Sequence, residues 1–88
     1  MTNGSGHVRF CKNGKICVVA YDITPSNANS IIEITIPEQY RLAQATFYDQ
    51  YTYKGNDIYI YSYSGVTYLR FAHTKQQEMI GSIVYIAK

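Results

Sequence analysis

Acid–base and nucleophilic side chains are few in this sequence, and their spacing fits no catalytic motif. Hydrolytic triads require a nucleophile, a base and an orienting acid, yet the two imidazoles, His7 and His73, lie in no local catalytic signature. The carboxylates fall in separate loops and strands, without the pairing that a glycosidase needs: Asp22, Glu33, Glu38, Asp49, Asp57 and Glu78. We therefore expect a protein that is not an enzyme.

The two cysteines, Cys11 and Cys17, flank a turn signal at Asn13-Gly14. A two-residue type I′ turn at that dipeptide pairs Cys11 with Ile16 and directs the two sulfurs to opposite faces of a hairpin. A disulfide is then disfavoured, although a bulged or longer turn would restore it. No second Cys/His pair accompanies them, and no glycine belongs to a phosphate loop, so we expect neither metal nor cofactor.

A stronger signal comes from residues 57–71, DIYIYSYSGVTYLRF, which alternate about Ser64-Gly65. This dipeptide predicts a two-residue hairpin turn. One face of the hairpin then pairs Ile58 with Phe71, Ile60 with Leu69 and Ser62 with Thr67. The other face pairs Tyr59 with Arg70, Tyr61 with Tyr68 and Tyr63 with Val66. The first face resembles a core, and the second predicts a flat aromatic platform.

We take Tyr59, Tyr61, Tyr63, Tyr68 and Arg70 as the candidate site. Tyrosines offer rigid apolar rings for a sugar or a partner, together with hydroxyls for hydrogen bonds. Arg70 could stack on Tyr59 or bind an acidic group, such as the phosphate of a cell-wall polymer. The same residues would equally suit a subunit interface, or burial under a second sheet. The residues alone leave these alternatives open.

The elements that must position this site are short strands separated by turn signals, with no convincing helical period. Such spacing predicts an all-β fold, an antiparallel β-sandwich or jelly-roll-like barrel of about seven short strands. In the strand at 31–36, Ile32, Ile34 and Ile36 alternate with Ile31, Glu33 and Thr35. Residues 38–43 have no strand pattern, and we expect a turn there, either irregular or a single turn of helix. The expected strands span residues 7–11, 15–23, 31–36, 45–53, 57–63, 66–72 and 79–87.

The register of the fourth strand decides where its own tyrosines lie. A two-residue turn at Gly55-Asn56 pairs Tyr51 with Ile60 on the apolar side. A three-residue turn pairs Tyr51 with Tyr61 and Tyr53 with Tyr59, which would widen the aromatic platform. Both registers stay open.

The composition fits one small domain at residues 7–88, preceded by a flexible leader or linker at residues 1–6. A net charge of +2, with scattered cations, argues against nucleic acid. We see neither a membrane span nor a signal peptide. The chain contains ten tyrosines, and only 16% of its residues are charged. This combination suggests that some aromatic surface is covered in an assembly.

Two segments resemble a recurrent pattern in tail-fibre and receptor-binding proteins of tailed bacteriophages. The first is GHVRFCKNGKICVV at residues 6–19, similar to a hairpin of the form V-x-F-x-K-N-G-x-x-V-x-V, and the second is IPEQYR at residues 36–41. The order of elements is similar from residue 6 to residue 88. Gln39 replaces the usual glycine and Leu42 the usual proline, which puts the geometry of this corner in question.

The resemblance implies a β-sandwich head at the C-terminal tip of a homotrimeric fibre, which binds host cell-surface saccharide. Its other partners would be tail or baseplate proteins, and its location the virion's tail tip, after synthesis in the host cytoplasm. Free thiols fit that reducing compartment. Two alternatives remain: a purely structural trimerising module of a baseplate or fibre, and a secreted carbohydrate-binding module.

Overall fold

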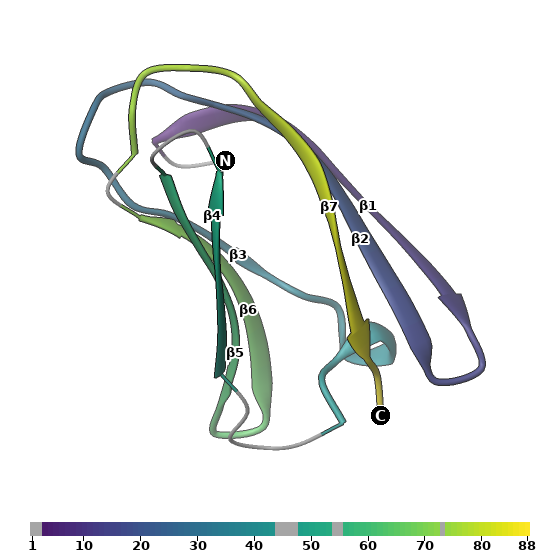
Figure 1. Ribbon diagram of the computed structural model, residues 1–88. Coiled ribbons are helices and arrows are strands. Elements are labelled where there is room, and N and C mark those ends of the chain that lie inside the picture. Colours follow the sequence, from purple (N-terminus) through teal and green to yellow (C-terminus); the bar gives the residue numbers. More distant parts are fainter. Residues whose placement is uncertain (1–2, 44–47, 54–55, 73) are drawn as a thin grey trace.

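The chain forms two antiparallel sheets that face each other as layers, as the computed structural model shows in Figure 1. It describes residues 3–43, 48–53, 56–72 and 74–88, apart from the side chains of residues 48–53 and 56. One sheet has the strand order β1-β2-β7, from Gly4–Asn13, Ile16–Pro25 and Met79–Ile86. The other has the order β3-β6-β5-β4, from Ile32–Thr35, Val66–Ala72, Asn56–Tyr63 and Tyr48–Tyr53.

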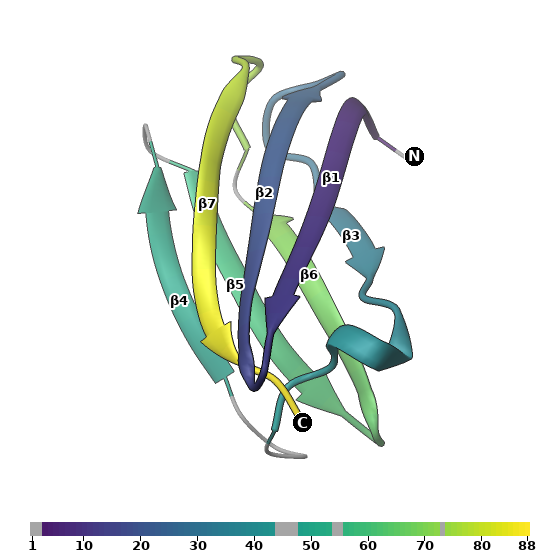
Figure 2. The same cartoon turned by 90° about the vertical axis from the view of Figure 1, so that its right-hand side faces the viewer.

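The all-β prediction is confirmed, with seven strands along the described chain. Both sheets remain open at their sides, so the architecture is a sandwich (Figure 2). The single helical turn expected after Pro37 is the 3-10 helix η1, Glu38–Tyr40.

The core lies between the sheets because each strand turns alternate apolar residues inward. Ile58, Ile60, Leu69 and Phe71 are fully buried. The face of the 57–71 hairpin that we expected to form part of the core therefore does so. Burial of each such side chain contributes roughly 1.5–3 kcal/mol. The opposite sheet supplies the facing side chains, mainly Cys17, Val19, Tyr21, Ile23, Met79, Ile83 and Tyr85.

A glycine in the middle of β7 makes room for one of these core residues. Gly81 is the Cα partner of Tyr21, and a Cβ atom at Gly81 would lie 2.6 Å from the Tyr21 hydroxyl oxygen. The Tyr21 ring in turn packs edge-on against Phe71 of the other sheet, with centroids 5.3 Å apart. A small residue at position 81 therefore lets an aromatic pair join the two layers.

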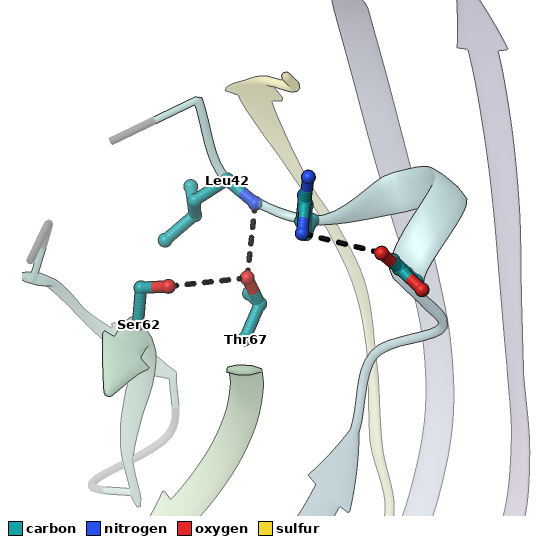
Figure 3. Close-up of polar contacts among 5 residues, drawn as sticks. Leu42, Ser62 and Thr67 are labelled. Carbon is teal, nitrogen blue, oxygen red and sulfur yellow. Dashed lines mark hydrogen bonds and ion pairs between the residues drawn. The ribbon is translucent and has the colours of Figure 1, made fainter. Parts of the chain in front are cut away.

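The connection from β3 to β4 is fixed to both sheets. The Leu42 N–H donates to Thr67 Oγ1 at 3.0 Å, and the Ser62 hydroxyl oxygen lies 3.4 Å from the same atom. Figure 3 shows how these three residues face one another. Leu42 also forms an isolated antiparallel bridge with Ala87 at the end of β7. Thr67 is buried, and these contacts provide hydrogen-bond partners for its hydroxyl group.

The first hairpin has a different register from the one expected. Asn13 pairs with Ile16 and Cys11 with Val18, so the turn residues are Gly14 and Lys15. Only Gly14, at φ +62°, has positive φ in this turn, which is the pattern of a type II′ turn, not type I′. Asn13 extends the strand instead of entering the turn.

The expected leader at residues 1–6 is wrong from Gly4 onward, because Gly4–Gly6 begin β1 and pair with β2. At Gly6, φ is +134° and a Cβ atom would collide with the Asp22 carbonyl. Glycine here permits a close backbone approach within a sheet, whereas the sequence suggested a linker. Residues 1 and 2 lie outside the described residues.

The fourth strand follows neither of the two registers considered. Tyr51 pairs with Ile58, Tyr53 with Asn56 and Tyr48 with Tyr61. Residues 54–55 lie outside the described residues, as do residues 45–47 of the expected strand. The β4 backbone register is thus known, whereas the expected positions of its tyrosine rings lie outside the described residues.

Candidate functional site

The candidate site lies on the outer face of the β5–β6 hairpin. All six predicted cross-strand pairs are present, including Tyr59–Arg70, Tyr61–Tyr68 and Tyr63–Val66. The turn has φ +51° at Ser64 and +79° at Gly65, as a type I′ turn requires. Because the second sheet covers the opposite face, the tyrosine face is directed away from the core, and burial beneath that sheet is excluded.

At the centre of this face Tyr61 and Tyr68 stack, with ring centroids 5.3 Å apart and planes inclined by 28°. The Arg70 guanidinium carbon lies 5.3 Å from the centroid of the Tyr61 ring, within range of a cation–π contact. The hairpin register thus brings three of the five candidate residues into one cluster.

Glu33 completes the cluster from the neighbouring strand β3. Its Oε2 atom accepts a 2.6 Å hydrogen bond from the Tyr61 hydroxyl and a 2.8 Å bond from Arg70 Nε, and Arg70 Nη2 lies 2.6 Å away. The position follows from the register of β3, which pairs Glu33 with Arg70. We call Glu33, Tyr61, Tyr68 and Arg70 the tyrosine platform.

These contacts shift the ionisation of their members. Mainly because Tyr61 donates to the carboxylate, and further because Arg70 is adjacent, the pKa of Glu33 is lowered from 4.5. Burial, together with the bond to Glu33, raises the pKa of Tyr61 to about 12. The pKa of Arg70 is also raised, chiefly by its hydrogen bond to Glu33. At neutral pH the platform therefore holds a carboxylate, a phenol and a guanidinium.

The remaining candidate residues flank the platform. Tyr63 is 70% exposed near the tip of the hairpin. Tyr59 is half-buried at the other end, with its Cα paired to that of Arg70 on one side and to that of Gln50 on the other. The five predicted residues share one outer face, and the structure brings Tyr61, Tyr68 and Arg70 into direct contact.

The platform is chemically suited to holding a flat, polar molecule. Arg70 and Glu33 keep 40% and 35% of their side-chain surface exposed. Their ion pair uses Arg70 Nε and Nη2, so the two N–H groups of Nη1 stay outside it. The stacked rings supply an apolar surface beside these donors.

Sequence reasoning assigned Glu33 to the correct face of its strand but gave it no role. Ile31, Glu33 and Thr35 are more exposed than Ile32 and Ile36, as the alternation predicts. The missing information was which strand lies beside β6. An outward acid on one strand and an outward arginine on another were the available signal.

A small pocket lies beside the tip of the hairpin, with a volume of about 80 Å³. It is lined by Arg41, Leu42, Ala43, Ser62, Gly65 and Lys88. Small-molecule sites usually occupy roughly 300 Å³ or more, so this hollow suits water or a small ion. Recognition of a sugar would therefore use the open face.

In the described part of the chain, no three His, Cys, Asp or Glu residues gather as metal ligands would, and no helix is long and apolar enough to cross a membrane. His73 and the Asp49 side chain lie outside that part. Cys11 is exposed and Cys17 is buried, and both are unpaired because β1 and β2 direct them to opposite faces.

Comparison with known proteins returned no relative: no protein-family model, curated protein or solved structure matches this chain.

Proposed function

We propose that this chain is a non-enzymatic head domain of a tailed-phage fibre or receptor-binding protein, which trimerises and binds host cell-surface saccharide. The observation that carries the proposal is the outward-facing stack of Tyr61 on Tyr68, held by the Glu33–Arg70 pair. The phage context is supported by the hairpin at residues 6–19 and the corner at 36–41, which resemble the tail-fibre pattern.

The platform favours saccharide because its rings are held before any ligand arrives. Glu33 fixes both the Tyr61 hydroxyl and the Arg70 guanidinium, so little side-chain entropy remains to be lost on binding. The C–H faces of a sugar ring can lie on Tyr61 or Tyr68, while Arg70 Nη1 donates to a hydroxyl or an acidic substituent. We expect a dissociation constant of roughly micromolar to millimolar per site, strengthened when three copies bind together.

Direct binding to a panel of bacterial surface saccharides tests this proposal, with capsular, lipopolysaccharide-derived and phosphate-bearing wall fragments as probes. Tyr61→Ala should weaken binding of the best probe by about tenfold or more. Tyr40→Ala is the matched control, because the Tyr40 ring stacks on Phe10, at a centroid distance of 4.9 Å, and is no part of the platform. Equal weakening by both variants, or no bound saccharide at all, would contradict the proposal.

A purely structural trimerising module is the second candidate. It is favoured by the contacts of Glu33 Oε2, because this oxygen already accepts from Tyr61 and Arg70 within the platform and therefore needs no ligand. In that case Tyr61→Ala would dissociate the assembly, and no saccharide would bind.

A further inference from the structure

One end of the sandwich gathers cationic side chains. Figures 1 and 2 show η1, the β1–β2 turn, the β5–β6 turn and the C-terminus at this end. The Lys88 N–H donates to the Arg41 carbonyl at 3.0 Å, and the Ala87 N–H donates to the Lys15 carbonyl at 2.7 Å. Lys12 Nζ donates to the main-chain oxygen of Lys88 at 3.1 Å. We call Lys12, Lys15, Arg41 and Lys88 the basic end.

Side-chain carboxylates are scarce at the basic end. Glu38 lies there, with its Oε1 atom 3.3 Å from Arg41 Nη1. The other acidic side chains that the structure describes belong to the middle of the strands or to the opposite end: Asp22 in β2, Glu33 in β3, Asp57 in β5 and Glu78 just before β7. The net charge of the whole sequence is only +2, so its positive charge is unevenly distributed.

The small hollow beside the tip of the β5–β6 hairpin opens at the basic end. Arg41 and Lys88 are among the residues that line it, together with Leu42, Ser62 and Gly65. Its volume of about 80 Å³ exceeds the roughly 30 Å³ that one water occupies in the liquid. The same volume is far below the roughly 300 Å³ of sites for larger ligands. The hollow therefore suits a compact ion and excludes a sugar ring.

Arg41 is the principal anion-binding group in this lining. A guanidinium carries five N–H groups, and the contact with Glu38 uses only Nη1. Along the described ranges, Nε and Nη2 of Arg41 have no acceptor. Glu38 is 82% exposed, so water competes for its contact with Arg41 and the ion pair is weak. Arg41 can therefore turn two or more N–H groups to an anion.

Two further donors are available at the hollow. Lys88 is exposed, and no acceptor for its ammonium group lies within the described part of the chain. The Ser62 hydroxyl is 3.4 Å from both the Val66 carbonyl oxygen and Thr67 Oγ1, which is long for an O–H donor. Figure 3 shows Ser62 beside Leu42 at this place. A closer acceptor in the hollow would replace these long contacts. Lys12, in contrast, is engaged by the main-chain oxygens of Gln39 and Lys88.

We infer that the hollow binds a tetrahedral oxyanion of the phosphate class, held by Arg41 and Lys88, with Ser62 as a third donor. A guanidinium presents parallel N–H donors that match two oxygens of such an anion, and an ammonium adds a point charge. Free phosphate and a phosphoryl ester of a surface polymer share this chemistry. A nucleic acid fits less well, because its binding commonly uses on the order of six to ten phosphate contacts.

The inference goes beyond the proposed function and does not rest on it. Ser62 is directed to the opposite face of β5 from Tyr61, because successive residues of a strand alternate. Tyr61→Ala should therefore leave phosphate binding unchanged. Failure of phosphate binding would likewise leave the saccharide proposal standing.

Titration of isotope-labelled protein with inorganic phosphate, followed by NMR at constant ionic strength, tests the inference. We expect saturable amide shifts at residues 41–43, Gly65 and Lys88, with a dissociation constant of about 1 mM. Arg41→Gln should weaken binding at least about tenfold, because it removes charged hydrogen bonds. Arg9→Gln is the matched control, since it removes the same group from an exposed position of β1 outside the hollow. It should change the dissociation constant by less than about twofold.

Glu38→Gln supplies a test of opposite sign. It releases Arg41 Nη1 and removes a negative charge from the basic end, so it should tighten phosphate binding by about twofold to fivefold. Circular dichroism should show the same strand content in every variant. Lys88→Gln, at an exposed position, replaces Arg41→Gln if that variant fails to fold.

Saturable shifts around the hollow that are lost in Arg41→Gln and kept in Arg9→Gln would support the inference. Absence of saturation up to about 100 mM phosphate, shifts elsewhere only, or equal weakening by both variants would overturn it. A glycerol phosphodiester is the second probe, and it distinguishes the two sources of the anion. Binding as tight as that of inorganic phosphate would assign the hollow to a phosphoryl ester, whereas weaker binding would assign it to the free anion.

Discussion

The Tyr61 hydroxyl donates to Glu33 Oε2 at 2.6 Å, across β6, which lies between their strands. The bond runs diagonally between the two outer strands of the set β3-β6-β5, and Arg70 on the middle strand contacts both residues. Stacked rings on the outer face of a sheet could otherwise rotate freely. Here an ion pair and a hydrogen bond fix the orientation of Tyr61.

The first prediction concerns the acidity of Glu33. Tyr61→Phe should raise the pKa of the Glu33 carboxyl group, because the Tyr61 hydrogen bond is the largest cause of its lowering. Carboxyl-carbon NMR titration of both proteins measures this directly. Tyr63→Phe is the matched control, since Tyr63 lies on the same face but near the exposed tip, and it should leave the Glu33 pKa unchanged. An unaltered Glu33 pKa in Tyr61→Phe would contradict the contact.

The same linkage predicts how acid affects stability. A lowered folded pKa contributes stability that is fully present above pH 4.5 and is lost as the pH falls through the folded pKa. Glu33→Gln should therefore lower the free energy of unfolding at pH 7 by about 1 kcal/mol or less, because the pair is partly exposed. Urea unfolding should show that the gap between the wild type and this variant narrows at pH 3. A gap that widens in acid would refute the assignment.

At alkaline pH the stability changes with pH in the opposite direction. The pKa of Tyr61 rises from 10.0 to about 12, so its contribution is fully present below pH 10 and is lost as the pH rises through 12. Wild-type protein should lose more stability than Tyr61→Phe over that interval. Tyr85, whose pKa is also raised by burial and by Cys17, is present in both proteins and cancels in the comparison. Identical alkaline unfolding curves would count against the platform.

Thiol reactivity should distinguish the two cysteines. Cys11 is exposed, and Cys17 is fully buried with its sulfur 3.1 Å from the Tyr85 hydroxyl oxygen. A thiol-specific reagent should label one cysteine in the native protein and both after denaturation. Peptide mapping should identify Cys11 as the native site. A protein with no titratable thiol until it is reduced would contain the disulfide that the strand geometry disfavours.

A larger residue at position 81 should destabilise the sandwich. Gly81→Ala places a methyl group against the Tyr21 ring, and we expect a loss of roughly 1–3 kcal/mol in the free energy of unfolding. Ser82→Ala is the matched control, because residue 82 is outward and exposed. Thermal and urea unfolding measure both. A Gly81→Ala variant as stable as the wild type would mean that Tyr21 can move aside without cost.

Local signals predicted the hairpin of the site completely. Ser64-Gly65 defines the turn, and alternation then fixes every pair from Asp57 to Ala72, because a two-residue turn leaves no freedom of register. The Asn13-Gly14 signal failed for a related reason. Gly14 and Lys15 form an equally short turn with only one residue at positive φ, and the sequence alone does not rank the two.

The contributions of distant strands could not be predicted in the same way. Glu33 reaches Arg70 only because β3 pairs with β6, across 37 residues of chain, and no turn chemistry encodes that neighbour. The place of Gly6 in β1 could not be predicted either, because the sequence does not distinguish a glycine in a flexible leader from a glycine at φ +134° in a sheet. Long-range order decides both.

The central claim is that the tyrosine platform is the surface that contacts a saccharide. Its most direct test is an NMR titration of isotope-labelled protein with the saccharide probe that binds best in the panel. We predict that the amide shifts concentrate at residues 59–63 and 66–70 and at Glu33, and that Tyr61→Ala abolishes them. Shifts confined to the β1-β2-β7 sheet, or shifts that persist in Tyr61→Ala, would contradict the claim.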